Sequence, residues 1–397
     1  MTDTKCPLLW NHLHISLNSI HSPCCHSQAY QDLGGWSELN WGKFDSKLGI
    51  NSEQHKLARQ QMRQGKRVPM CEICYRREDR GIESPRTRHL VDYPDIDYNS
   101  EPTHVHSIDI KFDRTCNLGC RMCGPYSSSF LNRELDAIPQ TDRFANEETD
   151  WNTDYAQDEK LELCKQLVKN GLRVFKTTGG EPFLQRHFVE FIDWCIETGY
   201  YKDITLRITT NLILANKKLL QKMFQFKHVY LNISCDGVGD VYEYIRYPAK
   251  WKDFDEKFNI IREFRKKYDD KKMDVSVSSV LQIYNLHNVE ALSNYFEGFD
   301  WQADTDCKPD GTELSVENLP KNIIDDYLEK NQHWLRLKHT NIFNYLGSLE
   351  YKNNLDEFCR KTLLYDKRRK QNYSVLDDSI VHIINTYKQE NNNVESI

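Results

Sequence analysis

Three cysteines stand close together in the segment that reads RTCNLGCRMCG: Cys116, Cys120 and Cys123. Three thiolates on one compact loop suit an iron–sulfur cluster, whose irons are held by cysteine sulfur. A [4Fe–4S] cubane with three protein ligands leaves one iron open, and an open coordination site is where a substrate or cofactor binds. The spacing alone also fits a structural zinc site whose fourth ligand comes from elsewhere, for which His104 and His106 are candidates.

A second candidate site is the segment Gly179-Gly180-Glu181-Pro182. Paired glycines let the backbone approach a ligand closely, because they carry no side chain. A carboxylate at that place can accept hydrogen bonds from an ammonium group. Taken alone, the segment is explained better as an ordinary strand-to-helix turn. Its predicted position on the same sheet edge as the three-cysteine loop favours a ligand site.

Together the segments CNLGCRMC and TTGGEP resemble the radical S-adenosylmethionine (SAM) superfamily, over about residues 106–300. The resemblance implies that the three cysteines hold a [4Fe–4S] cluster with one open iron, where SAM binds. It also implies that Gly179, Gly180 and Glu181 hold the methionine amino group. In such an enzyme the reduced cluster cleaves SAM to a 5′-deoxyadenosyl radical, which abstracts hydrogen from the substrate. The cofactor carries the difficult step, and the protein supplies binding, orientation and exclusion of water.

The same resemblance implies further SAM contacts at later strand ends. ITTNL (208–212) matches a Thr-Asn-Gly strand end with Leu212 in place of glycine, and LNISCDG (231–237) matches a Ser-x-Asp-Gly strand end. The residues placed at SAM in this way are Met122, Asn211, Ser234, Asp236 and Arg246. Met122 stands where the superfamily often has an aromatic residue against adenine, and a thioether is apolar and adaptable enough for that place. Cys235 lies between two of these residues and is the candidate catalytic thiol.

A second metal centre is predicted at Cys6, Cys24, Cys71 and Cys74. A CxxC pair with two distant cysteines can close a four-thiolate shell around zinc or a second [4Fe–4S] cluster. The surrounding segments CPLLWNHL and CEICYRRE resemble the auxiliary-cluster modules called twitch and SPASM. Those modules normally follow the barrel, whereas this one precedes it. Cys25 competes with Cys24 as the ligand, and inert thiols are the other alternative.

The twitch and SPASM resemblance implies a peptide or protein as the substrate, and we expect a flavodoxin- or ferredoxin-type protein as the electron donor. An alternative is radical modification of a sugar or another small molecule. A protein of a different class, an electron-transfer iron–sulfur protein, would need neither the TTGGEP segment nor an open iron. The sequence therefore argues against that class.

The candidate residues must be positioned by an alternation of strands and helices that begins near residue 106. Strands are predicted at residues 107–113, 172–178, 203–211, 228–237 and 273–282, and a helix follows each one. This repetition implies right-handed βαβ units and a parallel sheet. The units are too few for a closed eightfold barrel, and the resemblance implies an α/β fold with a partial (β/α)6 barrel. The carboxyl ends of parallel strands share one edge, which brings the two motifs together.

The chain divides into three predicted parts. Residues 1–100 form the cysteine-rich auxiliary module, residues 106–305 form the partial barrel, and residues 306–397 form a mostly helical C-terminal extension. The length of 397 residues, with 39% hydrophobic and 28% charged, is that of a globular protein of two or three domains.

Composition also indicates where the protein works. No apolar run approaches the roughly 18 residues of a membrane span and the N-terminus is a poor signal peptide, so we expect a cytoplasmic protein without a membrane partner. Thirteen cysteines in a reducing compartment are then metal ligands or small buried residues, not a disulfide framework. The net charge of −6 argues against a zinc-stabilised nucleic-acid-binding module.

Overall fold

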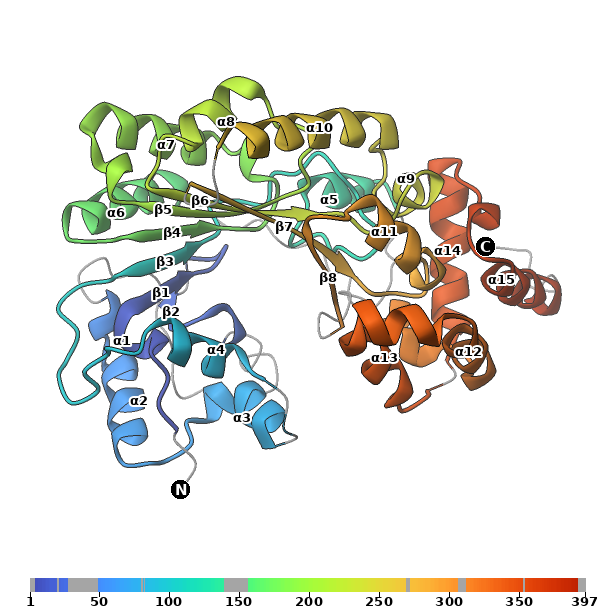
Figure 1. Ribbon diagram of the computed structural model, residues 1–397, viewed down its shortest axis with the longest axis horizontal. Coiled ribbons are helices and arrows are strands. Elements are labelled where there is room, and N and C mark those ends of the chain that lie inside the picture. The colour runs from blue at the N-terminus through green and yellow to red at the C-terminus, as the bar shows by residue number, and fades with distance from the viewer. Residues whose placement is uncertain are drawn as a thin grey trace.

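The computed structural model describes residues 4–19, 21–27, 49–79, 81, 83–138, 156–268, 272–305, 312–352 and 354–391. Within these ranges, one sheet of eight strands runs through the molecule in the spatial order β2-β1-β3-β4-β5-β6-β7-β8 (Figure 1). The strands are β1 (His12–Ile15), β2 (His21–Ser22), β3 (Ser107–Ile110), β4 (Val174–Thr177), β5 (Thr205–Thr210), β6 (His228–Ser234), β7 (Met273–Val280) and β8 (Asp300–Asp304).

The strands from β3 to β8 lie side by side in chain order and are all parallel. This order confirms the predicted open, partial (β/α)6 barrel, and β3 to β7 are the five strands predicted from the sequence. β1 joins the β3 edge in parallel, and β2 pairs with β1 antiparallel. These two strands are only four and two residues long, too short for a strand pattern to show in the sequence.

Helices cover the outer face of the sheet (Figure 1). They are α6 (Gln157–Lys169), α7 (Arg186–Thr198), α8 (Lys217–Met223) and α10 (Trp251–Lys267). In α7, Phe188, Phe191 and Cys195 recur at the spacing of one helical face and are fully buried. The helix stops at Gly199, whose φ of +84° suits a residue without a side chain.

Side chains alternate along the strands between the helix-covered face and a concave face. In β5, Leu206 and Ile208 are buried in the main core, whereas the half-buried Arg207 and Thr209 line a cavity on the concave side, which Ile208 also borders. The twofold repeat of a strand produces this division. The sheet therefore presents an apolar surface to its helices and a polar surface to the cavity.

The N-terminal part packs a small core of its own below the β1 edge (Figure 1). Its helices are α1 (Leu8–Asn11), α2 (Glu53–Arg63), α3 (Glu72–Asp79) and α4 (Pro85–Asp92). Arg59 is fully buried there, donates to the carbonyl oxygens of Leu9 and Ile50 at 3.0 and 2.7 Å, and pairs with Glu101 at 2.6 Å. Because β1 belongs to the barrel sheet, this part is joined to the barrel by backbone hydrogen bonds as well as by packing. Its boundary near residue 100 stays a prediction.

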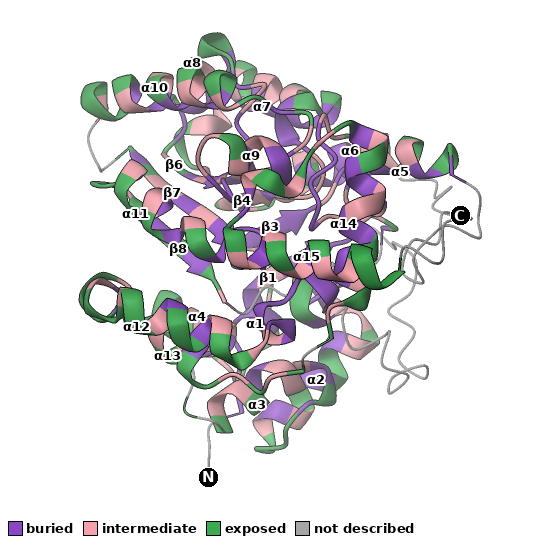
Figure 2. Cartoon of the chain, turned by 90° about the vertical axis from the view of Figure 1, so that its right-hand side faces the viewer, coloured by how far each residue is buried: buried purple, intermediate pink, exposed green. Residues whose placement is uncertain are grey.

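The C-terminal part is helical in the described residues, with α12 (Lys321–Lys338), α13 (Thr340–Gly347), α14 (Asp356–Arg369) and α15 (Asp378–Asn391). α14 is the more deeply buried of the last two helices (Figure 2). In the part of the chain that the structure describes, no helix is both long and apolar enough to span a membrane.

Candidate active site at the carboxyl edge of the sheet

The three-cysteine loop follows β3 directly and is held by its own backbone. The amide of Cys123 donates to the carbonyl oxygen of Cys120 at 3.0 Å, and the amide of Leu118 points at the sulfur of Cys116 at 3.5 Å. The amide of Cys116 donates to Ser129 Oγ at 3.2 Å. Cys120 is buried, whereas Cys116 and Cys123 are half-buried, so one side of the loop is accessible to a ligand.

The back of the loop is fixed to helix α9 (Asp240–Ile245) and the turn that follows it. The amide of Gly119 donates to the carbonyl oxygen of Tyr247 at 2.7 Å, and the amide of Arg121 donates to that of Ile245 at 2.9 Å. A Cβ atom on Gly119 would lie 2.8 Å from the ring of Phe130, so a larger residue there would require this ring to shift. The loop is thus rigid on the side away from the ligand.

The structure brings the two predicted motifs into direct contact. The amide of Glu181 donates to the carbonyl oxygen of Thr115 at 2.7 Å. Gly180 has a φ of +59°, and a Cβ atom there would lie 2.5 Å from the same oxygen. Only glycine allows the two loops to approach this closely.

The carboxylate of Glu181 is fully buried and bonded within the chain. It accepts hydrogen bonds from Thr210 Oγ1 at 2.6 Å and from the amide of Asn211 at 2.7 Å. Burial raises the pKa of Glu181 to about 7, against the opposing effect of these hydrogen bonds. The carboxylate therefore ties the glycine-rich turn to the end of β5. Its expected contact with the amino group of SAM stays a prediction.

The end of β5 reaches the cysteine loop through Asn211. Its Nδ2 donates to Asn117 Oδ1 at 2.9 Å and lies 4.0 Å from the sulfur of Cys116. The next residue, Leu212, is fully buried and has a φ of +68°, a conformation that favours glycine. The chain thus keeps the backbone turn of a Thr-Asn-Gly strand end with a leucine in place of the glycine.

A buried ion pair lies on the other side of the loop. Asp236 Oδ2 is 2.6 Å from Arg246 Nη2, and Arg246 Nη1 is 4.0 Å from the sulfur of Cys120. Burial raises the pKa of Asp236, although the neighbouring guanidinium acts in the opposite direction. Arg246 Nε is buried and has no hydrogen-bond partner among the described residues. A donor in this state can be satisfied by a bound ligand.

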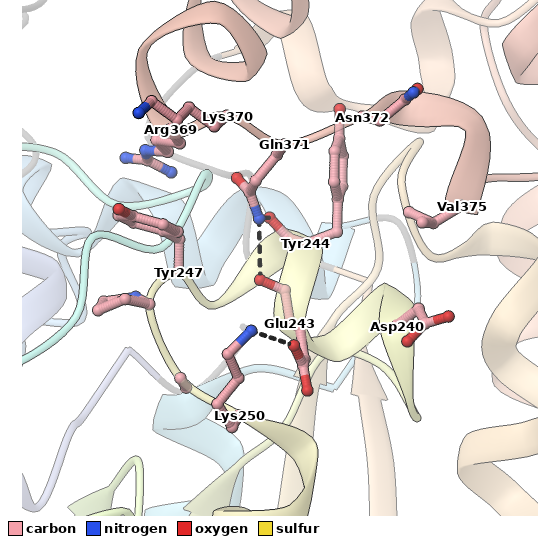
Figure 3. A pocket seen from close by; sticks show the side chains of 12 residues that line it. Asp240, Glu243, Tyr244, Tyr247, Lys250, Arg369, Lys370, Gln371, Asn372 and Val375 are labelled. Carbon is pink, nitrogen blue, oxygen red and sulfur yellow. Dashed lines mark hydrogen bonds and ion pairs between the residues drawn. The ribbon is translucent and has the colours of Figure 1, made fainter.

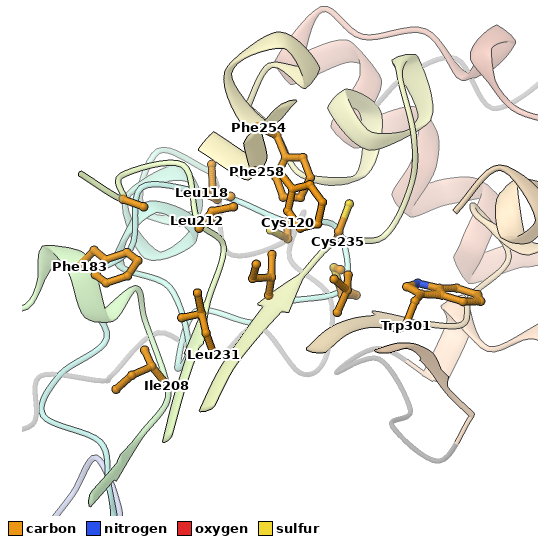
Figure 4. Close-up of a cluster of buried hydrophobic side chains, with 14 of the residues drawn as sticks. Leu118, Cys120, Phe183, Ile208, Leu212, Leu231, Cys235, Phe254, Phe258 and Trp301 are labelled. Carbon is orange, nitrogen blue, oxygen red and sulfur yellow. The ribbon is translucent and has the colours of Figure 1, made fainter. Parts of the chain in front are cut away.

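The other predicted residues lie at different depths. Ser234 ends β6 with a half-buried side chain opposite Ser278, and Met122 is buried in the main core. Cys235 is fully buried among hydrophobic side chains (Figure 4). Burial raises the pKa of the Cys235 thiol, and its sulfur donates to the carbonyl oxygen of Gly237 at 3.3 Å. This environment favours an inert thiol over a catalytic one.

The four N-terminal cysteines predicted to form a second centre converge. Burial, and after it the proximity of Cys6, Cys24 and Cys74, raises the pKa of the Cys71 thiol. Cys25 is exposed and faces the cavity on the concave side of the sheet. In the described residues, no three His, Cys, Asp or Glu side chains have the spacing of a single-metal site. The four thiols are therefore neighbours, and the second metal centre stays a prediction.

Two cavities adjoin these groups. One, of about 300 Å³, lies between α9 and the loop after α14, where Gln371 Nε2 donates to the carbonyl oxygen of Glu243 at 3.1 Å (Figure 3). The other, of about 990 Å³, lies over the concave face of the sheet and is bordered by Cys24. Its strand residues, Lys176 and Arg207 among them, were not singled out from the sequence. The sequence pattern that could have identified them is a polar residue at every second position of each strand.

Residues 110–292 match the family model described as the Radical SAM superfamily. Among curated proteins, the chain is 25% identical over 155 residues to GTP 3′,8-cyclase of Synechocystis sp., which covers 39% of this chain and 38% of that protein. It is 29% identical over 137 residues to molybdenum cofactor biosynthesis protein 1 of Dictyostelium discoideum, which covers 34% of this chain and 18% of that protein. The chain therefore spans less than two fifths of either relative.

Solved structures of similar arrangement include Streptococcus suis SuiB bound to S-adenosylmethionine. The alignment has a TM-score of 0.36 and 13% identity, over 64% of this chain and 48% of that chain. Another is anSMEcpe with bound AdoMet, with a TM-score of 0.39 and 20% identity, over 59% of this chain and 62% of that chain.

Proposed function

The chain carries a radical SAM domain and is an enzyme of that superfamily, and from this premise we propose that it modifies a peptide or protein and holds an auxiliary iron–sulfur cluster. The observation that carries the proposal is that Cys6, Cys24 and Cys74 lie near enough to Cys71 to raise the pKa of its thiol, and that Cys24 also borders the cavity over the sheet. The superfamily uses a [4Fe–4S] cluster and SAM, which when bound supply the 5′-deoxyadenosyl radical that abstracts hydrogen. Binding, orientation and exclusion of water fall to the chain's own residues.

The residues at the carboxyl edge fit these cofactors. Cys116, Cys120 and Cys123 would hold the cluster from one loop, as the thiolate ligands of such clusters do. The Nε of Arg246, which has no hydrogen-bond partner among the described residues, suits a carboxylate, which the methionine part of SAM carries. Asp236 holds that guanidinium in place. The fixed loops behind the site leave these donors little freedom to reorganise, which is what a preorganised site requires.

A peptide substrate suits the concave-face cavity. Its volume of about 990 Å³ lies at the upper end of the roughly 300–1,000 Å³ of small-molecule sites. Small-molecule sites are mostly apolar, whereas many side chains around this cavity are charged or polar. A peptide offers backbone donors and acceptors along its whole length, which such a surface can bind. The resemblance of CPLLWNHL and CEICYRRE to twitch and SPASM modules points to the same substrate class.

The second candidate is radical modification of a small molecule. The similarity to GTP 3′,8-cyclase over 155 residues favours it. That protein is named for a nucleotide substrate.

Metal analysis after anaerobic reconstitution tests the auxiliary cluster. We expect about eight irons per chain for two cubanes and about four for the core cluster alone. Cys74→Ala should lose the second set of irons and keep the first. Cys359→Ala is the matched control, because Cys359 is buried on α14 and should keep both sets. A wild-type count of about four irons would contradict the auxiliary cluster.

The formation of 5′-deoxyadenosine tests the substrate class. Reduced, SAM-loaded enzyme is incubated with a tryptic digest of a proteome, with GTP, or with neither. We expect the digest to raise 5′-deoxyadenosine above the substrate-free rate and to yield peptides of changed mass. Stimulation by GTP alone would replace the peptide proposal with the small-molecule one.

A further inference from the structure

A row of ionisable side chains crosses the concave face of the sheet. One residue from each of six adjacent strands stands in direct register with the next: His14, Asp109, Lys176, Arg207, Tyr230 and Asp274. From Asp109 to Asp274, all of them line the cavity of about 990 Å³. The part of the row from Asp109 to Asp274 is therefore the floor of that cavity.

Most charges of the row are paired. Lys176 Nζ lies 2.6 Å from Asp109 Oδ2, and Asp274 Oδ2 lies 2.9 Å from His228 Nε2. These pairs use both carboxylates of the floor. They leave one cation, Arg207, in the middle of the row.

Arg207 has no acidic partner among the described residues. Its guanidinium carbon lies 4.7 Å from the ring centroid of Tyr230, and its buried Nε has no hydrogen-bond partner in the part of the chain that the structure describes. On helix α4, which also borders the cavity, Asp92 already has a partner, because His89 Nδ1 lies 3.2 Å from Asp92 Oδ2. The guanidinium is thus held in place by an aromatic ring while its hydrogen-bonding edge stays unused.

Arg207 faces a second cation across the sheet. Lys176 is its direct cross-strand neighbour, and like charges opposite one another in a sheet are destabilising. A bound anion would offset this repulsion and satisfy the free donors. Arginine presents a planar fork that matches the two oxygens of a carboxylate or phosphate.

We propose that Arg207, with Lys176 beside it and Tyr230 against it, forms an anion subsite that binds a carboxylate or phosphate group of the substrate. The proposal rests on the proposed function in that the ligand is the substrate of the radical SAM site. Arg207 stands four residues before Asn211 at the carboxyl edge, about 13 Å along the strand at ~3.3 Å per residue. The anionic group is therefore remote from the reacting hydrogen and contributes to positioning.

Calorimetric titration of reconstituted, SAM-loaded enzyme tests the subsite at low ionic strength. The probes are inorganic phosphate and glutarate, which separate the two sources of an oxyanion. Arg207→Gln is compared with Arg336→Gln. Arg336 is the matched control, because its guanidinium carbon also lies over an aromatic ring, 4.4 Å from the centroid of Phe343, but on the exposed surface of α12.

We expect the wild type and Arg336→Gln to bind at least one probe, and Arg207→Gln to bind it roughly tenfold or more weakly. Binding of phosphate alone assigns a phosphorylated substrate, and binding of glutarate alone assigns a carboxylate. Equal binding by Arg207→Gln, or no binding by the wild type, overturns the subsite.

Two further readouts keep the test independent of folding and of the proposed function. The melting temperature of Arg207→Gln should equal or exceed that of the wild type, since the repulsion with Lys176 is removed. Its substrate-free formation of 5′-deoxyadenosine should match the wild type. If only Arg207→Gln lost substrate-free cleavage of SAM, the residue would belong to the SAM site and the subsite would be overturned. If the wild type itself did not cleave SAM, the radical SAM activity would be refuted instead.

Discussion

The side chain of Arg121, between the second and third cysteines of the core loop, donates a hydrogen bond to the carboxylate of Asp366 on α14, 245 residues further along the chain. Arg121 is fully buried, and its guanidinium carbon lies 3.7 Å from the ring centroid of Tyr244. Its Nε donates to the carbonyl oxygen of the same tyrosine at 2.9 Å. The C-terminal part thus holds the cysteine loop from behind through this buried ion pair, and Arg121 Nη2 also donates to Gln371 Oε1 at 3.0 Å.

Replacing Asp366 should destabilise the protein strongly. Asp366→Ala leaves the buried guanidinium of Arg121 without its charged partner, which costs about 3–5 kcal/mol of unfolding free energy in comparable buried pairs. Because the pair fixes the cysteine loop, we also expect the variant to retain less iron after gel filtration. Chemical denaturation and iron analysis measure the two effects.

Asp325→Ala is the control for this prediction. Asp325 pairs with Lys321 at 2.6 Å on the surface of α12, and both side chains are more than half exposed. Exposed pairs of this kind contribute about 0–1 kcal/mol. Equal losses in the two variants would show that the buried pair has no special role.

Leu212 supports a prediction about backbone strain. Its φ of +68° costs a residue with a side chain roughly 1–2 kcal/mol, and its buried side chain contributes more than that by packing. Leu212→Gly should therefore be less stable than the wild type. Leu212→Ala should be less stable still, because it loses the side chain and keeps the strain. Thermal unfolding of the three proteins gives the order.

At Leu220 we expect the opposite order of stability for the glycine and alanine variants. It is fully buried within helix α8, where glycine costs about 1 kcal/mol relative to alanine. Leu220→Gly should therefore unfold below Leu220→Ala. If alanine were also the better replacement at Leu212, strain at that position would be refuted.

The sequence predicted the parts of the fold that carry a repeating pattern or a fixed spacing. The five strands from β3 to β7 and the cysteine loop have such signals. β1 does not, because four residues are too few to show an alternation. The bond between Arg121 and Asp366 was beyond prediction as well, since nothing in the local sequence of either residue identifies a partner 245 positions away.

The carboxylate of Glu181 predicts a pH dependence. Its pKa is raised from 4.5 to about 7 in the folded chain, chiefly by burial. A raised pKa means that its contribution to stability is complete below about pH 4.5 and is lost as the pH rises through about 7. At 1.36 kcal/mol per pKa unit, the loss is about 3 kcal/mol.

Glu181→Gln removes this titration. The difference in unfolding free energy, wild type minus variant, should therefore decrease as the pH rises from 5 to 8. The altered hydrogen bonds of the variant add a difference that does not depend on pH. Urea denaturation at four pH values measures the difference. Parallel stability curves would contradict a carboxyl whose pKa is raised by burial.

The contact between the two motifs predicts that Gly180 cannot be replaced without loss of activity. Gly180→Ala would place a Cβ atom 2.5 Å from the carbonyl oxygen of Thr115, and backbone atoms cannot turn away as a flexible side chain can. The glycine-rich turn must then move relative to the cysteine loop. A misplacement of about 1 Å can cost 10²-fold in rate, so we expect cleavage of SAM to fall at least tenfold.

Gly199→Ala separates this effect from backbone strain alone. Gly199 ends α7 with a φ of +84°, and a Cβ atom there would have no heavy atom within 4 Å. Both variants should therefore lose roughly 1–2 kcal/mol of unfolding free energy from the left-handed conformation. Only Gly180→Ala should lose SAM cleavage at equal iron content, because only there does the added atom separate the two loops. Cleavage at the wild-type rate by Gly180→Ala would mean that the spacing of the two loops does not set the geometry of the active site.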